Sequence, residues 1–401
     1  MAGATIDHMI SLTILIAALL VAMMTYNGLF ASAVDYDRNR QVANKAVDLI
    51  NTICLSPGSP TNWGATNDSV FGFGLQDPQT GGYALSPYSI MRLRTSNDSQ
   101  LVEYYSTYYN NISLGYGGYL LIPVADCINY TTATELLGVN RTYGFRVDIV
   151  PTLNVDISQF SEDPYLKLKV DVRGPGLSLG GVTLNYYLFQ IIPGEEDEEP
   201  PTILTQEGVV QTDPDGSKLI HFPSVDNPDA AYYFIVYARL SGLDGVGYFS
   251  QDDLGSDPQY LVPFIQDFDN GTVIIAHNWD VHYFGPPEPA VMYNATFFAL
   301  SQDFHLTRVQ IENSTGLLNY GSKSNATTQI QASETGFLFI AYQGRGHVGS
   351  IVMPWGVSTL GVSTSFGGDP TGYDFVATEL RQVTIDNISY QVKVSAWKLG
   401  S

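Results

Sequence analysis

The sequence has few positive charges. It contains 18 Lys and Arg residues against 40 Asp and Glu residues, which gives a formal net charge of −22 at pH 7. Because a chain of this charge is repelled by nucleic-acid phosphates and by anionic headgroups, we expect no nucleic-acid partner and no electrostatic attraction to a membrane surface. Charged residues make up only 14% of the chain and hydrophobic residues 44%, a balance typical of folded rather than disordered proteins.

Cysteine is also scarce, since Cys54 and Cys127 are the only two. Two thiols are too few for zinc-finger or iron–sulfur frameworks, which require several soft ligands. In an oxidising exterior Cys54 and Cys127 can form a disulfide, which would stabilise the fold by roughly 4 kcal/mol in the chain-entropy model. The alternative is two unpaired, buried thiols.

Enzyme motifs are missing. No H-E-x-x-H motif, P-loop or dinucleotide fingerprint occurs. A G-x-S-x-G pattern at residues 176–180 is followed by GVTLNYYLF, which predicts a strand, whereas a nucleophile elbow requires a helix after the serine.

Two segments contain side chains of the kinds that bind metal ions. If HNWDVH at residues 277–282 is extended, its two histidines lie on opposite faces and cannot hold one metal ion. The acidic run at residues 195–199 lacks a calcium-ligand pattern and predicts a solvated loop. We expect no enzymatic activity, no cofactor and no metal site.

One long apolar run is present. Residues 10–30 have ILIAALLVAMM at their centre, and no charged side chain lies between Asp7 and Asp35. A helix of about 20 residues crosses the roughly 30 Å hydrocarbon core of a bilayer. The preceding MAGATIDHM has no Lys or Arg, so the basic region of a cleaved signal peptide is missing. We therefore expect one membrane-spanning helix that contacts the lipid bilayer, and no second anchor at the other end of the chain.

The helix is predicted to continue beyond the membrane. Apolar residues recur at helical spacing along residues 42–53 and form one stripe. These residues are Val42, Ala46, Leu49, Ile50 and Ile53. The segment SPGSP at residues 56–60 ends the helix, because proline has no amide proton and clashes with the preceding turn. Residues 1–56 are thus predicted to be a transmembrane and amphipathic helix.

This long helix, closed by CLSPGSPTNWG at residues 54–64 and followed by β-structure, resembles archaeal type IV pilin-like and archaellin-like surface proteins. The resemblance covers about the first 65 residues. It implies that the apolar half-helix lies in the membrane or packs with copies of itself, with other pilins or with envelope proteins. The sequence differs from the family in one respect: Ala2-Gly3-Ala4 lacks the charged residue of the processing site. Asp7 matches the acidic residue near the mature pilin N-terminus, or simply caps the helix at the membrane boundary.

The side of the membrane on which the body lies is indicated by N-glycosylation sequons of the N-x-S/T type. They are about three times as frequent as chance predicts, and all follow the helix, as expected for a surface outside the cell. The candidate glycosylation sites are Asn67, Asn97, Asn111, Asn129, Asn140, Asn270, Asn294, Asn313, Asn325 and Asn387. The basic residues Arg38, Arg40 and Lys45 favour the opposite orientation by the positive-inside rule. We give more weight to the sequons and expect a cell-membrane protein with an extracellular body.

The body is predicted to be mainly β-structure in tandem sandwiches. Residues 57–150 read as a β-rich head, in which VFGFGL and SIMRLR are expected strands and TTATELLG a helical turn. Residues 151–250 read as an immunoglobulin-like sandwich. Residues 251–401 predict a further β-sandwich, with a jelly-roll-like arrangement as one form of it. The tyrosines at residues 104–116 are expected to pack half-buried in a sheet, with a sugar- or protein-binding surface as the alternative.

The middle unit has the clearest pattern. Its residues 165–173 alternate apolar side chains with charged ones, which predicts a strand with one buried face. Gly174-Pro175-Gly176 and Asp213-Pro214-Asp215-Gly216 predict tight turns. Together with GVTLNYYLF and YFIVYARLSGLDGVGY, these segments resemble the immunoglobulin-like repeats of bacterial and archaeal surface proteins.

Two classes of function follow. The first is a single-pass, pilin-like archaeal cell-surface glycoprotein with a structural, adhesive or filament-forming role. The second is a membrane-anchored carbohydrate-binding protein, with or without an associated hydrolase activity, that binds glycans through exposed aromatic residues such as Trp279 or Trp355.

Overall fold

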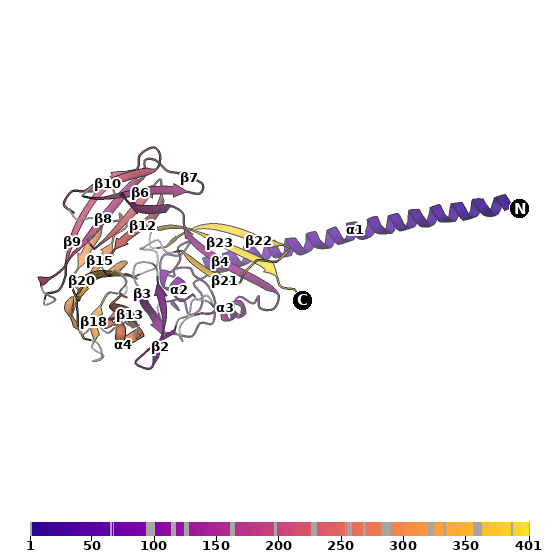
Figure 1. The fold of residues 1–401 in the computed structure, drawn as a ribbon. Coiled ribbons are helices and arrows are strands. Elements are labelled where there is room, and N and C mark those ends of the chain that lie inside the picture. The colour runs from indigo at the N-terminus through magenta and orange to yellow at the C-terminus, as the bar shows by residue number, and fades with distance from the viewer. Residues whose placement is uncertain are drawn as a thin grey trace.

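The computed structural model shows a β-rich body at one end of a single long helix (Figure 1). Its described residues are 2–64, 66, 68–93, 101–113, 118–123, 128–160, 165–195, 199–225, 231–252, 254, 259–267, 270–282, 290–319, 325–331, 334–355, 363–385 and 388–400. Side chains are described for these residues except 2–8, 101, 108, 110–113, 118–123 and 282.

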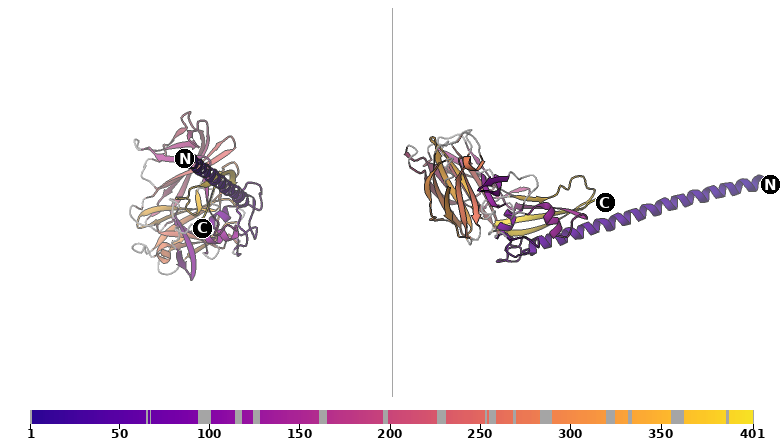
Figure 2. Two further views of the ribbon diagram at one scale, coloured as in Figure 1. Left: turned by 90° about the vertical axis from the view of Figure 1, so that its right-hand side faces the viewer. Right: turned by 90° about the horizontal axis from the view of Figure 1, so that it is seen from below.

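Helix α1 spans Ala2–Leu55 and continues without a break from the apolar run into the amphipathic stripe. Its first half extends away from the body, and its second half lies against it (Figures 1 and 2). The remaining helices of the described chain are short: α2 (Pro87–Met91), α3 (Tyr130–Leu136) and α4 (Asn278–His282). The predicted helical turn near residue 135 is confirmed as α3.

Within the described residues, the strands form five sheets. The six-stranded sheet contains β1 (Leu101–Tyr104), β2 (Thr107–Ser113), β3 (Gly118–Pro123), β13 (Leu261–Asp267), β14 (Thr272–His277) and β18 (Asn325–Gln329). The outer sheet contains β5 (Asn154–Gln159), β6 (Leu166–Gly174), β7 (Leu177–Ser178) and β10 (Ser217–Phe222). The central sheet contains β8 (Thr183–Ile192), β9 (Thr202–Gln211), β11 (Tyr232–Leu240) and β12 (Leu243–Gln251).

The other two sheets complete the body. The five-stranded sheet contains β15 (Val291–Leu300), β16 (Leu306–Val309), β17 (Thr315–Leu318), β19 (Gly336–Gly344) and β20 (His347–Trp355). The helix-side sheet contains β4 (Tyr143–Pro151), β21 (Thr364–Gly367), β22 (Val376–Ile385) and β23 (Ile388–Lys398). The prediction of a mainly β protein with an N-terminal helix is therefore confirmed.

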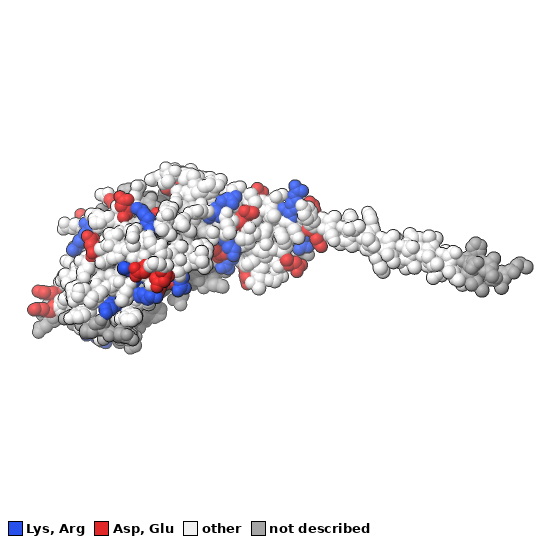
Figure 3. Space-filling model, turned by 90° about the horizontal axis from the view of Figure 1, so that it is seen from above, with Lys and Arg blue, Asp and Glu red and all other residues white. Residues whose placement is uncertain are grey.

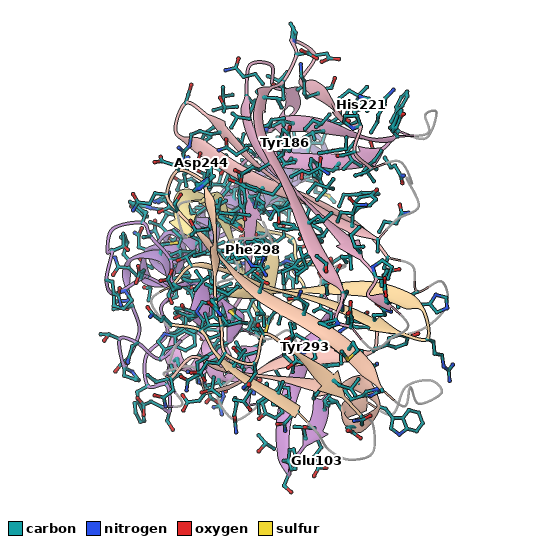
Figure 4. All side chains as sticks on the ribbon, turned by 90° about the vertical axis from the view of Figure 1, so that its left-hand side faces the viewer. Glu103, Tyr186, His221, Asp244, Tyr293 and Phe298 are labelled. Atoms are coloured by element: carbon teal, nitrogen blue, oxygen red, sulfur yellow. The ribbon has the colours of Figure 1, made fainter. Side chains whose placement is uncertain are left out.

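Strand β11 of the central sheet is buried on both faces along Tyr232–Ala238. From β11, Phe234 and Val236 point into the core shared with the outer sheet, where the rings of Phe234 and Phe222 lie 5.6 Å apart. The neighbouring Tyr233 points the other way and lies 5.9 Å from Phe339 of the five-stranded sheet. Three layers are thus stacked on one another, and the middle layer belongs to two interfaces. In Figure 4, His221 of the outer sheet lies toward one end of the body, Phe298 of the five-stranded sheet near the middle, and Glu103 of the six-stranded sheet at the opposite end.

The outer sheet matches the predicted alternation. Leu166, Leu168, Val170 and Val172 are fully buried, whereas the charged residues between them are part-exposed. The turn at Asp213-Pro214-Asp215-Gly216 is also confirmed: the Gly216 amide donates to the Asp213 carbonyl over 2.9 Å. Gly216 has a φ of +82°, a conformation that glycine adopts without the steric cost of a side chain.

The predicted ranges 57–150 and 251–401 share two sheets. Strand β4 pairs with β23 along nine residues from Tyr143 to Pro151, and β3 pairs in parallel with β13. The predicted boundaries at residues 150 and 251 therefore do not separate the sheets of these two ranges. Local sequence patterns show that a strand forms but not which distant strand it pairs with.

Two segments predicted as strands are not strands. SIMRLR contributes to α2, because the Ser86 side chain accepts a hydrogen bond from the Ser89 amide and Pro87 starts the helix. Among the described residues, VFGFGL forms a single isolated bridge, between Gly72 and Ser59. HNWDVH is also not a strand throughout, since β14 ends at His277 and α4 begins at Asn278.

Candidate functional site

The exposed half of α1 is the main candidate site. Every described side chain from Met9 to Arg38 is exposed, and the segment is long and apolar enough to cross a membrane. Figure 3 shows this part of the helix projecting from the body without charged side chains over most of its length. Exposed fractions such as 57% for Leu15 and 52% for Leu20 leave a continuous apolar cylinder in solvent. Such a surface is stable only when lipid or other apolar chains cover it.

Three hydroxyl side chains of this half form hydrogen bonds within the helix. Thr13, Thr25 and Ser32 donate hydrogen bonds to backbone carbonyls four residues earlier, over 2.8–2.9 Å. A hydroxyl paired in this way adds little cost to burial in hydrocarbon, where no water replaces a missing partner. These three hydroxyl residues are therefore compatible with a lipid environment.

A charged neck follows the apolar segment directly. Asp35 and Asp37 are the first acidic residues of α1 whose side chains are described, and Arg38 and Arg40 follow them on the exposed helix. Blue and red side chains gather in Figure 3 where the helix meets the body. The exposed Tyr36 lies beside this neck, the position that tyrosine favours at a membrane–water interface. The helix surface thus changes from apolar to charged within about one helical turn.

The second half of α1 is packed into the body. Val42, Ala46, Leu49, Ile50 and Ile53 have exposed fractions of 2% or less, which confirms the predicted stripe. They lie in the large hydrophobic core, where α1 contacts β22 and β23 of the helix-side sheet. Burying each such aliphatic side chain stabilises by about 1.5–3 kcal/mol. The body is therefore held firmly by the same helix that carries the exposed apolar segment.

The end of α1 is tied to the following loop. The Leu75 amide donates to the Ile53 carbonyl over 2.8 Å, which satisfies one of the carbonyls that a helix end leaves unpaired. Trp63 is fully buried beneath this junction, and its indole Nε1 donates to the Gly74 carbonyl over 3.0 Å. The guanidinium of Arg92 lies 5.2 Å from the Trp63 ring centroid. Sequence analysis missed Arg92, because an arginine in SIMRLR gives no sign that it is buried.

The disulfide between Cys54 and Cys127 stays a prediction. Cys54 is fully buried on the packed half of α1. Cys127 lies outside the described residues.

The ten sequon asparagines occupy different environments. Asn129, Asn140, Asn270, Asn313 and Asn325 are exposed, and Asn294 is half-buried in β15. Asn111 lies in β2, but its side chain is not among those described, and Asn67, Asn97 and Asn387 lie outside the described residues. Glycosylation therefore stays a prediction, and the exposed positions are compatible with it.

Two of the clustered tyrosines pack in a sheet, as predicted, but they are buried more deeply than the predicted half-burial. Tyr104 and Tyr109 are 5% exposed, with rings 4.9 and 5.1 Å from Phe264 of the six-stranded sheet. Burial raises the pKa of Tyr104 to about 12. Tyr105 is 56% exposed, whereas the Tyr108 side chain and the whole of Tyr116 lie outside the described part. The rings of Tyr104 and Tyr109 are therefore part of the hydrophobic core and are not available to bind a ligand.

Aromatic residues suggested for sugar binding are mostly covered. Trp355 is fully buried and cannot stack on a sugar, so this part of the carbohydrate-binding hypothesis is wrong. Trp279 is half-buried at the start of α4, where its amide donates to Nδ1 of His277 over 3.1 Å. No coplanar pair of exposed tryptophans is present among the described side chains.

The candidate catalytic and metal patterns have structural explanations. In G-x-S-x-G, Leu177–Ser178 form the short strand β7 paired with β6, and a strand follows at Thr183 as predicted. Within the described chain, no group of three or more His, Cys, Asp and Glu side chains is arranged to hold a metal ion. The acidic run is only partly described, because residues 196–198 lie outside the described set.

The fold and this site define a class: a mainly β body carried on one apolar N-terminal helix. No family model matches the chain, and no curated protein matches it. Solved structures give weak similarities: a Salmonella alpha-2-macroglobulin reacted with methylamine at 12% identity and TM-score 0.19, and a red sea bream transglutaminase at 10% and 0.17. The similar regions cover 58% and 62% of this chain but only 17% and 37% of those chains. A human GIVD cytosolic phospholipase A2 gives a TM-score of 0.12. Similarities at this level carry no conclusion about function.

Proposed function

We propose that this protein is a single-pass, pilin-like archaeal cell-surface protein whose β body is held outside the membrane by α1. The observation that carries the proposal is the division of one unbroken helix into a fully exposed apolar half and a half buried in the body. Because the helix is continuous, it would hold the body at a fixed distance from the membrane that its apolar half spans. The role that fits this arrangement is structural or adhesive and not enzymatic.

The outward orientation of the body is supported by the sequons. All ten follow the apolar segment, and five have exposed side chains among the described residues. N-linked glycosylation takes place on the exterior side of membranes. A glycoprotein with its body outside the cell agrees with this distribution.

The same exposed helix is suited to two arrangements. In a membrane anchor its apolar side chains contact lipid, whereas in a filament they contact copies of the helix or other pilins. The resemblance to pilins favours a filament, but a body of more than 340 residues is large for a major pilin. We therefore favour an anchored or minor-pilin role.

Detergent fractionation tests the proposal. Native cell envelopes are extracted with a mild detergent and centrifuged at high speed, both fractions are probed for the chain, and the pellet is examined by negative-stain microscopy. Release of dispersed protein by detergent, but not by salt or alkaline carbonate, is the result expected of a lipid anchor. Detergent-resistant filaments would show that the helix packs against other copies. Recovery in the soluble fraction without detergent would overturn both arrangements.

A further inference from the structure

The turn between α3 and β4 presents one sequon more openly than the other sequons whose side chains are described. Asn140, Arg141 and Thr142 are all exposed, so the complete acceptor triplet faces solvent. The backbone is held by hydrogen bonds from the Asn140 amide to Thr134 and from the Thr142 amide to Val139. The Asn140 side chain makes no hydrogen bond within the described part of the protein. Its Nδ2 atom is therefore available to an external reactant.

The other exposed sequon amides are more restricted. Nδ2 of Asn270 donates to Asp267 over 2.7 Å, and Nδ2 of Asn313 donates to the Thr327 carbonyl over 2.7 Å. Nδ2 of Asn325 lies 3.4 Å from the Tyr104 hydroxyl. Glycosylation of these three in the folded protein requires an existing contact to break.

Asn129 and Asn294 differ from Asn140 in other ways. Asn129 caps α3 through its Oδ1, and the middle residue of its triplet, Tyr130, is half-buried, with a hydroxyl that accepts from the Phe145 amide. Asn294 lies in β15, half-buried, with Nδ2 donating to the Pro201 carbonyl over 2.9 Å. The second and third residues of the Asn294 triplet are buried, so an enzyme cannot reach it without unfolding the strand.

Asn140 also lies at the end of the body that faces the proposed membrane. The Leu399 amide donates to the Thr142 carbonyl over 3.0 Å, so the turn is tied to the last residues of the chain. Figure 1 shows the C-terminus on the side of the body from which α1 projects. A saccharide donor embedded in the bilayer through a lipid chain would approach the body from this side.

We propose that Asn140 is an N-glycosylation site of the folded protein and that Asn294 is not modified. The saccharide donor is a polyprenyl-phosphate-linked sugar. Nδ2 of Asn140 forms a bond to the anomeric carbon, the bond from that carbon to the phosphate oxygen breaks, and the lipid phosphate leaves with the electron pair. The amide loses one proton to a base of the glycosyltransferase, and no oxidation or reduction takes place. This inference rests on the proposed outward orientation of the body.

The test is glycopeptide mass spectrometry on the full-length protein purified from native membranes. We expect the peptide containing Asn140 to carry a saccharide in most molecules and the peptide containing Asn294 to carry none. Thr142→Ala removes the sequon and should abolish the modification at Asn140. Thr142→Ser keeps the sequon and is the matched control, which should retain it. Asn294→Gln should leave the intact mass of the saccharide component unchanged.

Two results would overturn the inference. One is an unmodified Asn140 peptide in protein that carries saccharide at other sequons. The other is an unmodified Asn140 peptide in protein that carries none. Protease digestion of intact cells then separates the two proposals: a body cleaved from outside keeps the anchored-surface function while the glycosylation site is wrong, and a protected body shows that the outward orientation itself is wrong.

Discussion

Trp63 connects the loop that follows α1 to two later segments of the same part of the chain. Its ring packs near Phe73 at 6.4 Å between centroids, and its indole nitrogen binds the carbonyl of Gly74. Arg92 covers the ring and also donates to the Thr66 carbonyl over 3.0 Å, although only 2% of the arginine is exposed. The tryptophan therefore gives the buried cation an apolar and polarisable neighbour. This contact fixes the loop that follows α1.

Replacement of Trp63 should weaken the body strongly. We expect Trp63→Ala to lower the free energy of unfolding by about 3–5 kcal/mol, because it leaves a cavity and removes the cover of Arg92. Urea unfolding in a mild detergent, followed by tyrosine and tryptophan fluorescence, measures the change. Leu177→Ala is the control, since Leu177 is 72% exposed and the loss should stay within about 0.5 kcal/mol. Equal effects of the two variants would contradict this account of the junction.

Asp369 titrates below its ordinary range. The Thr371 hydroxyl donates to Oδ1 of Asp369 over 2.5 Å and the Thr371 amide over 2.9 Å, and both bonds lower the pKa of the carboxyl below 3.8. Because the pKa is lowered in the folded state, its contribution to stability is present at neutral pH and is lost as the pH falls through the folded-state pKa. The turn at residues 369–371 should therefore loosen in acid.

Carbon-13 NMR of aspartate-labelled protein measures this pKa. Thr371→Val removes the hydroxyl and should raise the pKa of Asp369 toward its ordinary value. Thr371→Ser keeps both donors and should leave the pKa low. If the valine variant titrates at the same pH as the unmodified protein, the hydroxyl is not the cause.

The two halves of α1 illustrate how one element serves two environments. Ile16 is 50% exposed on the projecting half, whereas Ile50 is fully buried against the helix-side sheet. Both residues favour the helix equally, so the difference comes from the surroundings and not from local propensity. The projecting half depends on lipid or neighbouring chains, and the packed half depends on the body.

A pair of matched substitutions tests this division. We expect Ile50→Ala to lower the unfolding free energy of the body by about 2–5 kcal/mol, the usual cost of such a truncation in a core. Ile16→Ala should leave the body's stability in detergent unchanged, because Ile16 contacts no part of it. Thermal unfolding followed by near-ultraviolet circular dichroism provides the comparison. A similar loss from both variants would mean that the projecting half folds back onto the body.

At the scale of the whole molecule, the central sheet joins layers that otherwise would form separate units. Residues of β11 that are adjacent in sequence enter different cores, as Tyr233 and Phe234 do. Removal of either side chain should therefore weaken strand β11, which belongs to the core with the outer sheet and to the core with the five-stranded sheet. The outer and five-stranded sheets are expected to lose their order together.

Calorimetry distinguishes shared from independent unfolding. We expect a single main transition for the body, lowered to a similar extent by Tyr233→Ala and Phe234→Ala, each of which costs about 3–5 kcal/mol. Leu204→Ala on the exposed surface of β9 is the control, since Leu204 is 49% exposed. Two transitions, each lowered by only one of the variants, would show that the layers unfold as separate domains.

The sequence predicted features that depend on near neighbours. The apolar run, the stripe from Val42 to Ile53 and the alternation along Leu166–Arg173 each follow from a regular spacing that buries or exposes one face. Local patterns did not predict the structure of segments in which two signals compete. SIMRLR has strand-like composition, but a capping Ser86 and Pro87 start a helix there.

By itself, the sequence determined a long apolar helix, its amphipathic continuation and a mainly β body, because these depend on period and composition. Only the tertiary structure decided that β4 pairs with β23, that the central sheet lies between two others, and that Arg92 is buried against Trp63. Among the sequons whose side chains are described, it also decided that Asn140 has an open triplet and a side-chain amide without a hydrogen-bond partner. The physical reason is that strand pairing and burial depend on the whole set of available partners, many of which lie far away in the sequence.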